Sequence, residues 1–345
     1  MFLFLSFFIV VSQINGNDKV STEKILVLAP VKNIEKGFCQ SKKNITKFVS
    51  FFSDYRIIIY ENNSSDKTKE LFLKWKKTEP KLLFFSENLD QTFLSKLIKS
   101  PIGNCRTEII ARARNILIEK ACAKEFEDYH IILMADLDSF GNWDIEQMLD
   151  TLRHPEHEWD AIMPAATYDL YAIRGAKFLL NPEIITVPTW AEFLPRIGTY
   201  YANYLSQDRW VLVDSAFGGL CFLNKINLDG IKYEGLMSPS YLDDLLNKDF
   251  SNDCIYRLNP EKFDKEIQIY KNNLLAWKDS GFHNSKIPEN AYNCEHAMFF
   301  FNMRKRGFDR IYINPRWQHF SNEHPNYPIT RRNTLIKSKK FGKQT

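Results

Sequence analysis

Two aspartates, Asp136 and Asp138, directly follow an apolar run in the segment I-I-L-M-A-D-L-D at 131–138. Residues at positions i and i+2 of an extended chain share one face, so these two carboxylates can converge on one point. Carboxylate oxygens bind hard divalent cations, and magnesium or manganese held in this way can grip a diphosphate as a leaving group. The competing interpretation is a strand that ends in a turn at 139–142, with both aspartates in solvent.

Apolar runs that alternate with helical patterns must position this pair. Buried strands are predicted at 25–29, 56–60, 82–85, 131–133, 161–163 and 311–315. Helices are predicted at about 41–52, 66–77, 107–121, 142–153 and 294–301, with Thr107 and Asn142 as N-caps. Strands that are continuous apolar runs indicate a largely parallel sheet with helices on both faces. The sequence therefore predicts an α/β fold in a single large domain.

The pattern loosens between 168 and about 290, where aromatic residues accumulate. Sugar rings pack their C–H faces on aromatic side chains, so an acceptor pocket is expected in this irregular region, although core packing is the commoner role of each aromatic. Gly218 and Gly219 lie there between two apolar runs. Adjacent glycines in this setting indicate either close approach of a ligand or a tight bend.

Composition is that of an ordinary globular protein, with 345 residues, 44% hydrophobic and 26% charged. The tail at 325–345 holds six basic residues and no acidic one, and because the whole chain carries +4, the rest is near −2. We expect this tail to be solvated and disordered. No recognition motif accompanies it, so no nucleic-acid partner is expected.

The first eleven residues are apolar except for one serine, and a polar stretch follows at 12–19, apart from one isoleucine. This run fits the core of a signal peptide and is shorter than the roughly 20 residues that span a bilayer. Residues 1–18 are expected to be either a signal peptide or a short signal anchor, which would associate the chain with a membrane. As a signal, the leader would direct the chain to the lumen of the endoplasmic reticulum or Golgi, or to export.

Two further features bear on an exported protein. Six cysteines could form disulfides there, in pairings that the sequence does not choose between. Asn44, in the triplet N-I-T, begins a glycosylation sequon. No Cys/His cluster in the sequence suggests zinc.

Three stretches together resemble a glycosyltransferase of the GT-A fold, which is Rossmann-like. The segment Y-E-N-N-S-S-D-K-T at 60–68 resembles the acid-x-S-x-D-x-T segment of family-two transferases. A-R-A-R-N at 111–115, followed by M-A-D-L-D, resembles their A-R-N … D-A-D succession. W-D-A-I at 159–162, the segment at 168–175 and the Gly218-Gly219 segment are similar to fungal capsule-associated mannosyltransferases.

The resemblance implies a GT-A domain at 19–324. Its nucleotide-sugar half would span about 24–165 and its acceptor half about 166–324. The implied activity is metal-dependent transfer of a sugar from a UDP- or GDP-linked donor to a glycan, glycoprotein or glycolipid, with Mn²⁺ or Mg²⁺ as cofactor.

Carried over position by position, the resemblance also implies roles for individual residues. Asp138 would bind the metal, Asp136 would contact the metal or the donor ribose, and His319, beyond the last predicted strand, would be a further metal ligand. The implied nucleotide-sugar contacts are Ala29, Glu61, Asp66, Arg112, Arg114, Gly218 and Gly219, with either arginine approaching the diphosphate.

Glu295 opens an apolar helix and is the first candidate for the base that an inverting transfer requires; Asp214 is the second. If the transfer retains configuration, no such base is needed and Glu295 would orient the acceptor.

Two other classes of protein compete with a glycosyltransferase. One is a non-catalytic carbohydrate-binding protein of the same fold. The other, less favoured, is a DxD phosphatase, since Ser139-Phe140 replaces the usual Gly-Thr after its motif.

Overall fold

The computed structural model describes residues 20–90, 92, 106–139, 141–166, 172–174, 209–247, 260–279 and 294–319. Within them lies an eight-stranded sheet of order β3-β2-β1-β4-β7-β5-β8-β6. The strands are β1 (Val20–Val31), β2 (Phe52–Asn62), β3 (Leu82–Glu87), β4 (Ile131–Ala135), β5 (Ala161–Ala166), β6 (Val211–Leu212), β7 (Leu220–Asn224) and β8 (Ile311–His319). The α-helices are α1 (Phe38–Val49), α2 (Thr68–Lys76), α4 (Arg106–Ala121), α5 (Ile145–Arg153), α7 (Pro239–Asn247), α8 (Pro260–Asp279) and α9 (Glu295–Lys305).

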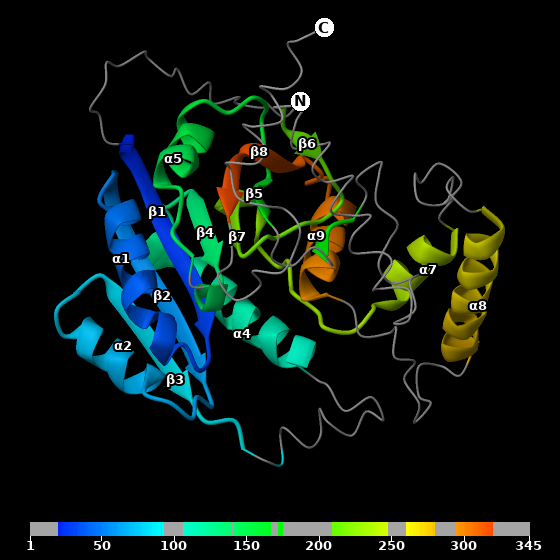
Figure 1. Ribbon diagram of the computed structural model, residues 1–345, viewed down its shortest axis with the longest axis horizontal. Helices are drawn as coiled ribbons and strands as arrows, with labels where there is room; N and C mark the ends of the chain where they lie inside the picture. The colour runs from blue at the N-terminus through cyan, green and yellow to red at the C-terminus, as the bar shows by residue number, and fades with distance from the viewer. Residues whose placement is uncertain are drawn as a thin grey trace, which may run out of the picture.

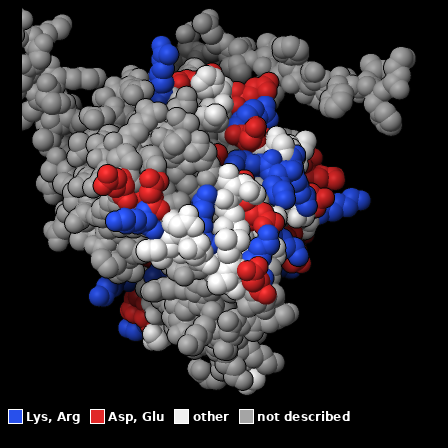
Figure 2. All heavy atoms as spheres, turned by 90° about the vertical axis from the view of Figure 1, so that its right-hand side faces the viewer, with Lys and Arg blue, Asp and Glu red and all other residues white. Residues whose placement is uncertain are grey.

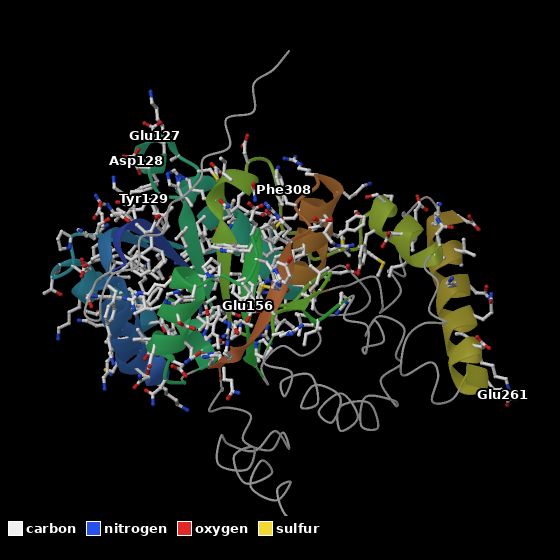
Figure 3. The ribbon with its side chains drawn as sticks, turned by 90° about the horizontal axis from the view of Figure 1, so that it is seen from above. Glu127, Asp128, Tyr129, Glu156, Glu261 and Phe308 are labelled. Atoms are coloured by element: carbon white, nitrogen blue, oxygen red, sulfur yellow. The ribbon has the colours of Figure 1, made fainter. Side chains whose placement is uncertain are left out.

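Six strands of this sheet run in one direction. Strands β3, β2, β1 and β4 pair in parallel, β7 is antiparallel to both β4 and β5, and β5 pairs in parallel with β8. Asp128 and Phe308, which precede β4 and β8, accordingly lie on the same side of the molecule in Figure 3. The carboxyl ends of six strands thus share one edge with the amino end of β7. The predicted α/β fold with a mostly parallel sheet is confirmed, and the short antiparallel strands β6 and β7 are added to it.

Helices cover both faces of the sheet, and alternate residues of β1 show how. Ile25 and Val27 pack in the core that contains α1, α2 and α5, whereas Leu26 and Leu28 pack in the core that contains α4, α7 and α9. Successive side chains of a strand point to opposite faces, so one continuous apolar run supplies both cores. In Figure 1, α1 and α2 lie at one end of the molecule and α7 and α8 at the other.

Two predicted helix starts are wrong. The N-cap of α5 is Asp144, whose carboxylate accepts from the Gln147 backbone N–H at 3.3 Å, while Asn142 accepts from the side chain of Gln40 instead. Thr107 lies inside α4, which begins at Arg106. Asp and Asn cap helices about equally well, so local sequence does not separate neighbouring candidates.

The irregular region predicted at about 166–324 contains two helices that were not predicted. Helices α7 and α8 lie within it and are joined by an ion pair between Lys278 Nζ and Asp243 Oδ1 at 2.5 Å. Most of the other residues between 167 and 293 lie outside the described residues. On the face shown in Figure 2, acidic and basic side chains of the described residues are interspersed, so they form no patch of a single sign there.

Burial contradicts the glycosylation sequon. Asn44 is 6% exposed, and its amide donates to the carbonyl of Gly141 at 2.8 Å. A glycan on this nitrogen would have to pass through packed protein.

Cys39, Cys122 and Cys221 are free thiols. The leader at 1–18 and the tail at 325–345 lie outside the described residues, and among the described helices none has the length and apolar character needed to cross a bilayer.

Candidate functional site

Asp136 and Asp138 lie where β4 ends and passes into the short 3-10 helix η3 (Leu137–Ser139). The backbone N–H of Asp136 donates to the carbonyl of Gly219 at 2.9 Å, so the start of β7 fixes the first residue after β4. The negative charge of Asp138 acts on Asp136 and contributes to raising its pKa. The structure thus brings the predicted pair together at the carboxyl edge of the sheet, where ligands of open α/β sheets bind.

Arg114, on α4, joins Asp136 to Glu295 at the start of α9. Its side chain is 2% exposed; Nη2 donates to Asp136 Oδ1 at 2.8 Å, and Nε donates to Glu295 Oε1 at 3.4 Å. The guanidinium carbon lies 4.7 Å from the ring centre of Phe217 and 5.7 Å from that of Tyr233. A planar guanidinium suits such combined ionic and aromatic contacts. The remaining nitrogen, Nη1, is buried and has no hydrogen-bond partner among the described residues.

The electrostatics of this cluster favour a cation. Burial raises the pKa of Asp136 to about 6; Arg114 opposes the shift, and the charges of Asp138 and Glu295 add to it. Burial lowers the pKa of Arg114, but the charges of Asp136 and Glu295 more than offset this, so Arg114 stays protonated. Three carboxylates therefore accompany one guanidinium, and their formal charges leave an excess of two negative charges. A divalent cation would balance that excess.

The donor set fits magnesium or manganese through two carboxylates. Magnesium is commonly held by one or two carboxylates while water and substrate phosphates complete its coordination. Among the described residues, no group of three or more His, Cys, Asp or Glu side chains is placed to bind one metal ion. Within the described part of the chain, Asp136 and Asp138 are therefore not grouped with the third protein ligand that the resemblance implied.

His319 is engaged elsewhere. It is the last residue of β8, which runs four residues beyond the predicted end because it continues to pair with β5 past a register shift. The ring is fully buried, with Nε2 3.0 Å from the hydroxyl of Ser139, and its Nδ1 has no hydrogen-bond partner within the part of the chain that the structure describes. Burial lowers the pKa of His319 to about 4, so the ring is neutral at pH 7. The expected ligand set of Asp136, Asp138 and His319 is therefore not assembled in this structure.

Glu61 and Ala29 lie at the same edge, as expected for nucleotide contacts, but both are buried. Glu61 is 1% exposed, and its two carboxylate oxygens accept from the backbone N–H of Ser64 at 2.7 Å and the hydroxyl of Ser86 at 2.6 Å. Ala29 is fully buried in β1. The Glu61 carboxylate thus orders the loop after β2. This structural role is separate from the nucleotide contact that the resemblance implied.

Asp66 organises the turn before α2. Its carboxylate accepts from the backbone N–H groups of Glu35 and Thr68, each at 3.0 Å. Burial alone would raise its pKa, but these bonds and that to the Thr68 hydroxyl lower the pKa of Asp66 below its ordinary value. The spacing of Glu61 and Asp66 therefore has a local explanation, because each carboxylate accepts a backbone N–H group from the segment between the end of β2 and the start of α2.

Arg112 and Arg114 have different partners, although both were candidates for the diphosphate. Arg112 pairs with Glu87 at the end of β3 and donates to the hydroxyl of Tyr60 at 2.6 Å. Its side chain is 35% exposed, whereas Arg114 is enclosed. Of the two, Arg112 is the arginine that solvent reaches.

Gly218 and Gly219 form a tight bend, with φ of 67° and 82°. A Cβ atom on Gly218 would lie 2.8 Å from the Cβ of Ala166, closer than real Cβ contacts allow. This positive-φ conformation favours glycine. Of the two alternatives for these glycines, the structure supports the bend, which brings the carbonyl of Gly219 to Asp136.

Asp214 belongs to a different set of contacts from Glu295. Its carboxylate faces Arg304 Nη1 at 3.4 Å. Arg304 lies nine residues beyond Glu295 on α9, about 13 Å along a helix that rises 1.5 Å per residue. The structure thus separates the two candidate bases, and it places Glu295, which is 6% exposed, beside Arg114.

Two buried polar groups, Asp160 and His296, were not predicted from the sequence. Asp160, in the W-D-A-I segment, is fully buried and accepts from Arg310 Nη2 at 2.8 Å and from the amide of Asn227 at 2.7 Å. His296 stacks on Phe217 with ring centres 3.7 Å apart, and burial lowers its pKa well below the ordinary value. Arg310, Asn227 and Phe217 are distant from them in sequence, so no local signal could have identified these contacts.

Comparison with known proteins gives similarity at the level of structure. No protein-family model matches the chain, and no curated protein matches it. The Staphylococcus aureus TarS fragment 1–349 is 12% identical, with 87% of this chain and 61% of that chain covered, at a TM-score of 0.38. The mannosyltransferase PcManGT from Pyrobaculum calidifontis, in complex with GDP-Man and Mn²⁺, is 11% identical over 84% of this chain and 74% of that chain, at 0.36.

A third similar structure is glucosyl-3-phosphoglycerate synthase from Mycobacterium tuberculosis, in complex with Mn²⁺, UDP and phosphoglyceric acid. It is 13% identical over 61% of this chain and 58% of that chain, at a TM-score of 0.32. The chain spans less than two thirds of the TarS fragment and of this synthase. At these scores the similarities are distant, and no residue role is transferred from them.

Proposed function

We propose that this protein is a metal-dependent glycosyltransferase of the GT-A fold, which moves a sugar from a UDP- or GDP-linked donor to a glycan, glycoprotein or glycolipid. The observation that carries the proposal is the Asp136–Asp138 pair at the carboxyl edge of six codirectional strands, in a cluster with excess negative charge. The likeness to fungal capsule-associated mannosyltransferases stays a prediction. With its leader acting as a signal, the enzyme would work in the secretory lumen or outside the cell.

Asp136 and Asp138 are the residues that would hold Mn²⁺ or Mg²⁺. When bound there, the ion supplies Lewis-acid stabilisation of the charge that develops on the departing diphosphate. Arg114 keeps Asp136 ionisable in its buried position, because the guanidinium opposes the rise in pKa that burial causes.

Glu295 is the side chain that would act on the acceptor. In an inverting transfer, its carboxylate takes the proton of the acceptor hydroxyl while the oxygen attacks the anomeric carbon and the bond to the diphosphate breaks. In a retaining transfer, the same carboxylate orients the acceptor and takes no proton. Asp214 is the weaker candidate because it pairs with Arg304, away from Asp136.

The test combines a binding screen with one variant. UDP-, GDP- and CMP-sugars are screened by thermal shift with and without Mn²⁺, since a ligand that binds the folded state raises the unfolding temperature. The donor that binds is then used in a transfer assay with wild type and Asp138→Ala. We expect metal-dependent stabilisation and transfer in wild type, and neither in the folded variant.

Three results would count against the proposal. Full transfer in excess chelator would remove the metal. Sugar binding without hydrolysis or transfer would indicate a carbohydrate-binding protein. Release of inorganic phosphate from simple monoesters would indicate a phosphatase.

A further inference from the structure

The side chain of Arg114 is buried within the candidate site and contacts two of its carboxylates. Two of its nitrogens reach carboxylates on different elements, Asp136 after β4 and Glu295 at the start of α9. The resemblance implied that either Arg112 or Arg114 approaches the donor diphosphate. With a side chain that is 2% exposed, Arg114 instead lies behind the carboxylates.

We propose that Arg114 is a positioning residue, which fixes Asp136 in the orientation that the metal requires and sets its place relative to Glu295. This inference rests on the proposed function and adds to it a residue that acts through its neighbours. Arg114 does so without contacting the donor.

Packing immobilises the guanidinium plane. It lies over Phe217, and Phe217 is itself stacked on His296 with ring centres 3.7 Å apart. The ring of Tyr233 lies 5.7 Å from the guanidinium carbon. A side chain packed against aromatic rings at these distances has little rotamer freedom. Its hydrogen bonds can therefore fix the orientation of the carboxylates that accept them.

Asp136 is consequently restrained through both its backbone and its side chain. Gly219 accepts its backbone N–H at 2.9 Å, and Arg114 donates to Oδ1 at 2.8 Å. The hydrogen bond from Arg114 therefore restricts the direction in which the Asp136 carboxylate can face.

Charge and positioning are separated by the choice of substitution. The charge of Arg114 opposes the rise in the pKa of Asp136, so its loss can weaken metal binding through protonation as well as through lost orientation. Lysine keeps the positive charge but not the planar fork of the guanidinium. A loss of metal affinity in Arg114→Lys therefore reports on orientation.

The experiment measures Mn²⁺ affinity by titration calorimetry on the full chain, in wild type, Arg114→Gln and Arg114→Lys. For Arg114→Gln we expect a loss approaching a hundredfold, and for Arg114→Lys a loss on the order of tenfold, as for outer residues that orient metal ligands. Lysine keeps the charge but lacks the rigid fork that reaches two carboxylates. In transfer assays at saturating Mn²⁺, we expect both variants to lose activity mainly through a lower kcat.

Arg310→Gln is the matched control, because Arg310 also pairs with a buried aspartate, Asp160, at 2.8 Å. We expect it to lower the unfolding temperature and leave Mn²⁺ affinity unchanged. This control separates loss of stability from loss of orientation.

Unchanged or tighter Mn²⁺ binding by Arg114→Gln would overturn the inference. Unchanged affinity in Arg114→Lys would overturn it equally, whether or not Arg114→Gln folds, because it would show that the positive charge is sufficient. If wild type binds Mn²⁺ and Asp138→Asn does not, either of these two results would overturn the inference and leave the proposed function intact. Folded wild type that binds no Mn²⁺ would refute the proposed function, and the inference with it.

Discussion

Replacing Asp136 by Asn is expected to stabilise the metal-free protein at neutral pH. The carboxyl is 15% exposed, and burial with the charges of Asp138 and Glu295 raises its pKa from 3.8 to about 6 in spite of Arg114. A raised pKa means that the folded state binds this proton more tightly than the unfolded chain does. Ionised Asp136 therefore costs folded-state free energy, which the neutral amide of Asn avoids.

The magnitude follows from the two pKa values of Asp136. At 1.36 kcal/mol per pKa unit, the difference between 3.8 and about 6 corresponds to about 3 kcal/mol. Below about pH 4 the carboxyl is protonated in both states, so wild type and variant should be equally stable. Between about pH 4 and 6 the unfolded chain loses the proton first, so wild-type stability falls relative to the variant. Above about pH 7 the advantage of the variant should stay near its maximum.

The assay is urea unfolding in chelator at pH 4, 5, 6, 7 and 8. Subtracting wild type from variant cancels the titration of groups that do not interact with Asp136. Asp128→Asn is the control, because Asp128 is 73% exposed and precedes β4 on the opposite edge of the sheet (Figure 3). It should change stability little at any pH. Added Mn²⁺ should stabilise wild type by about 2.7 kcal/mol at a hundred times its Kd, and Asp136→Asn by less.

One result would refute this reasoning. Removing one partner of a buried ion pair typically costs about 3 to 5 kcal/mol, because the other charge is left uncompensated. If Asp136→Asn is less stable than wild type at pH 7 and 8, attraction to Arg114 outweighs burial, and the stated direction of the pKa is wrong.

Asp160→Asn should destabilise the protein by about 1 to 3 kcal/mol, because a neutral amide replaces the buried carboxylate that accepts from Arg310 and Asn227, and should not change Mn²⁺ affinity; equal stability in urea unfolding would contradict the structural role of this pair. Gly218→Ala should cost at least about 1 kcal/mol, since it places a Cβ 2.8 Å from that of Ala166 at a φ of 67°, and a thermal midpoint equal to wild type would argue against the bend. Glu295→Gln should lower kcat by a factor of about 100 or more if Glu295 is the base of an inverting transfer, whereas a loss confined to the acceptor KM would indicate an orienting role.

The sequence by itself determined most of the strands and the position of the candidate site. Continuous apolar runs marked the parallel strands, because a strand buried on both faces has no polar side to alternate with. The spacing of Asp136 and Asp138 after such a run placed them at the carboxyl edge, where the structure has them. The ends of elements were less certain, as β8 shows, because pairing with β5 extends it to His319.

Only the tertiary structure decided the partners of the charged side chains. Arg114 contacts Asp136 and Glu295 across separations of 22 and 181 residues, and Arg112, two positions away, belongs to another network. The enclosure of His319 and the pairing of Asp214 with Arg304 were equally beyond local sequence. Periodicity reports the geometry of one element, whereas these contacts depend on how helices from distant parts of the chain close over the sheet.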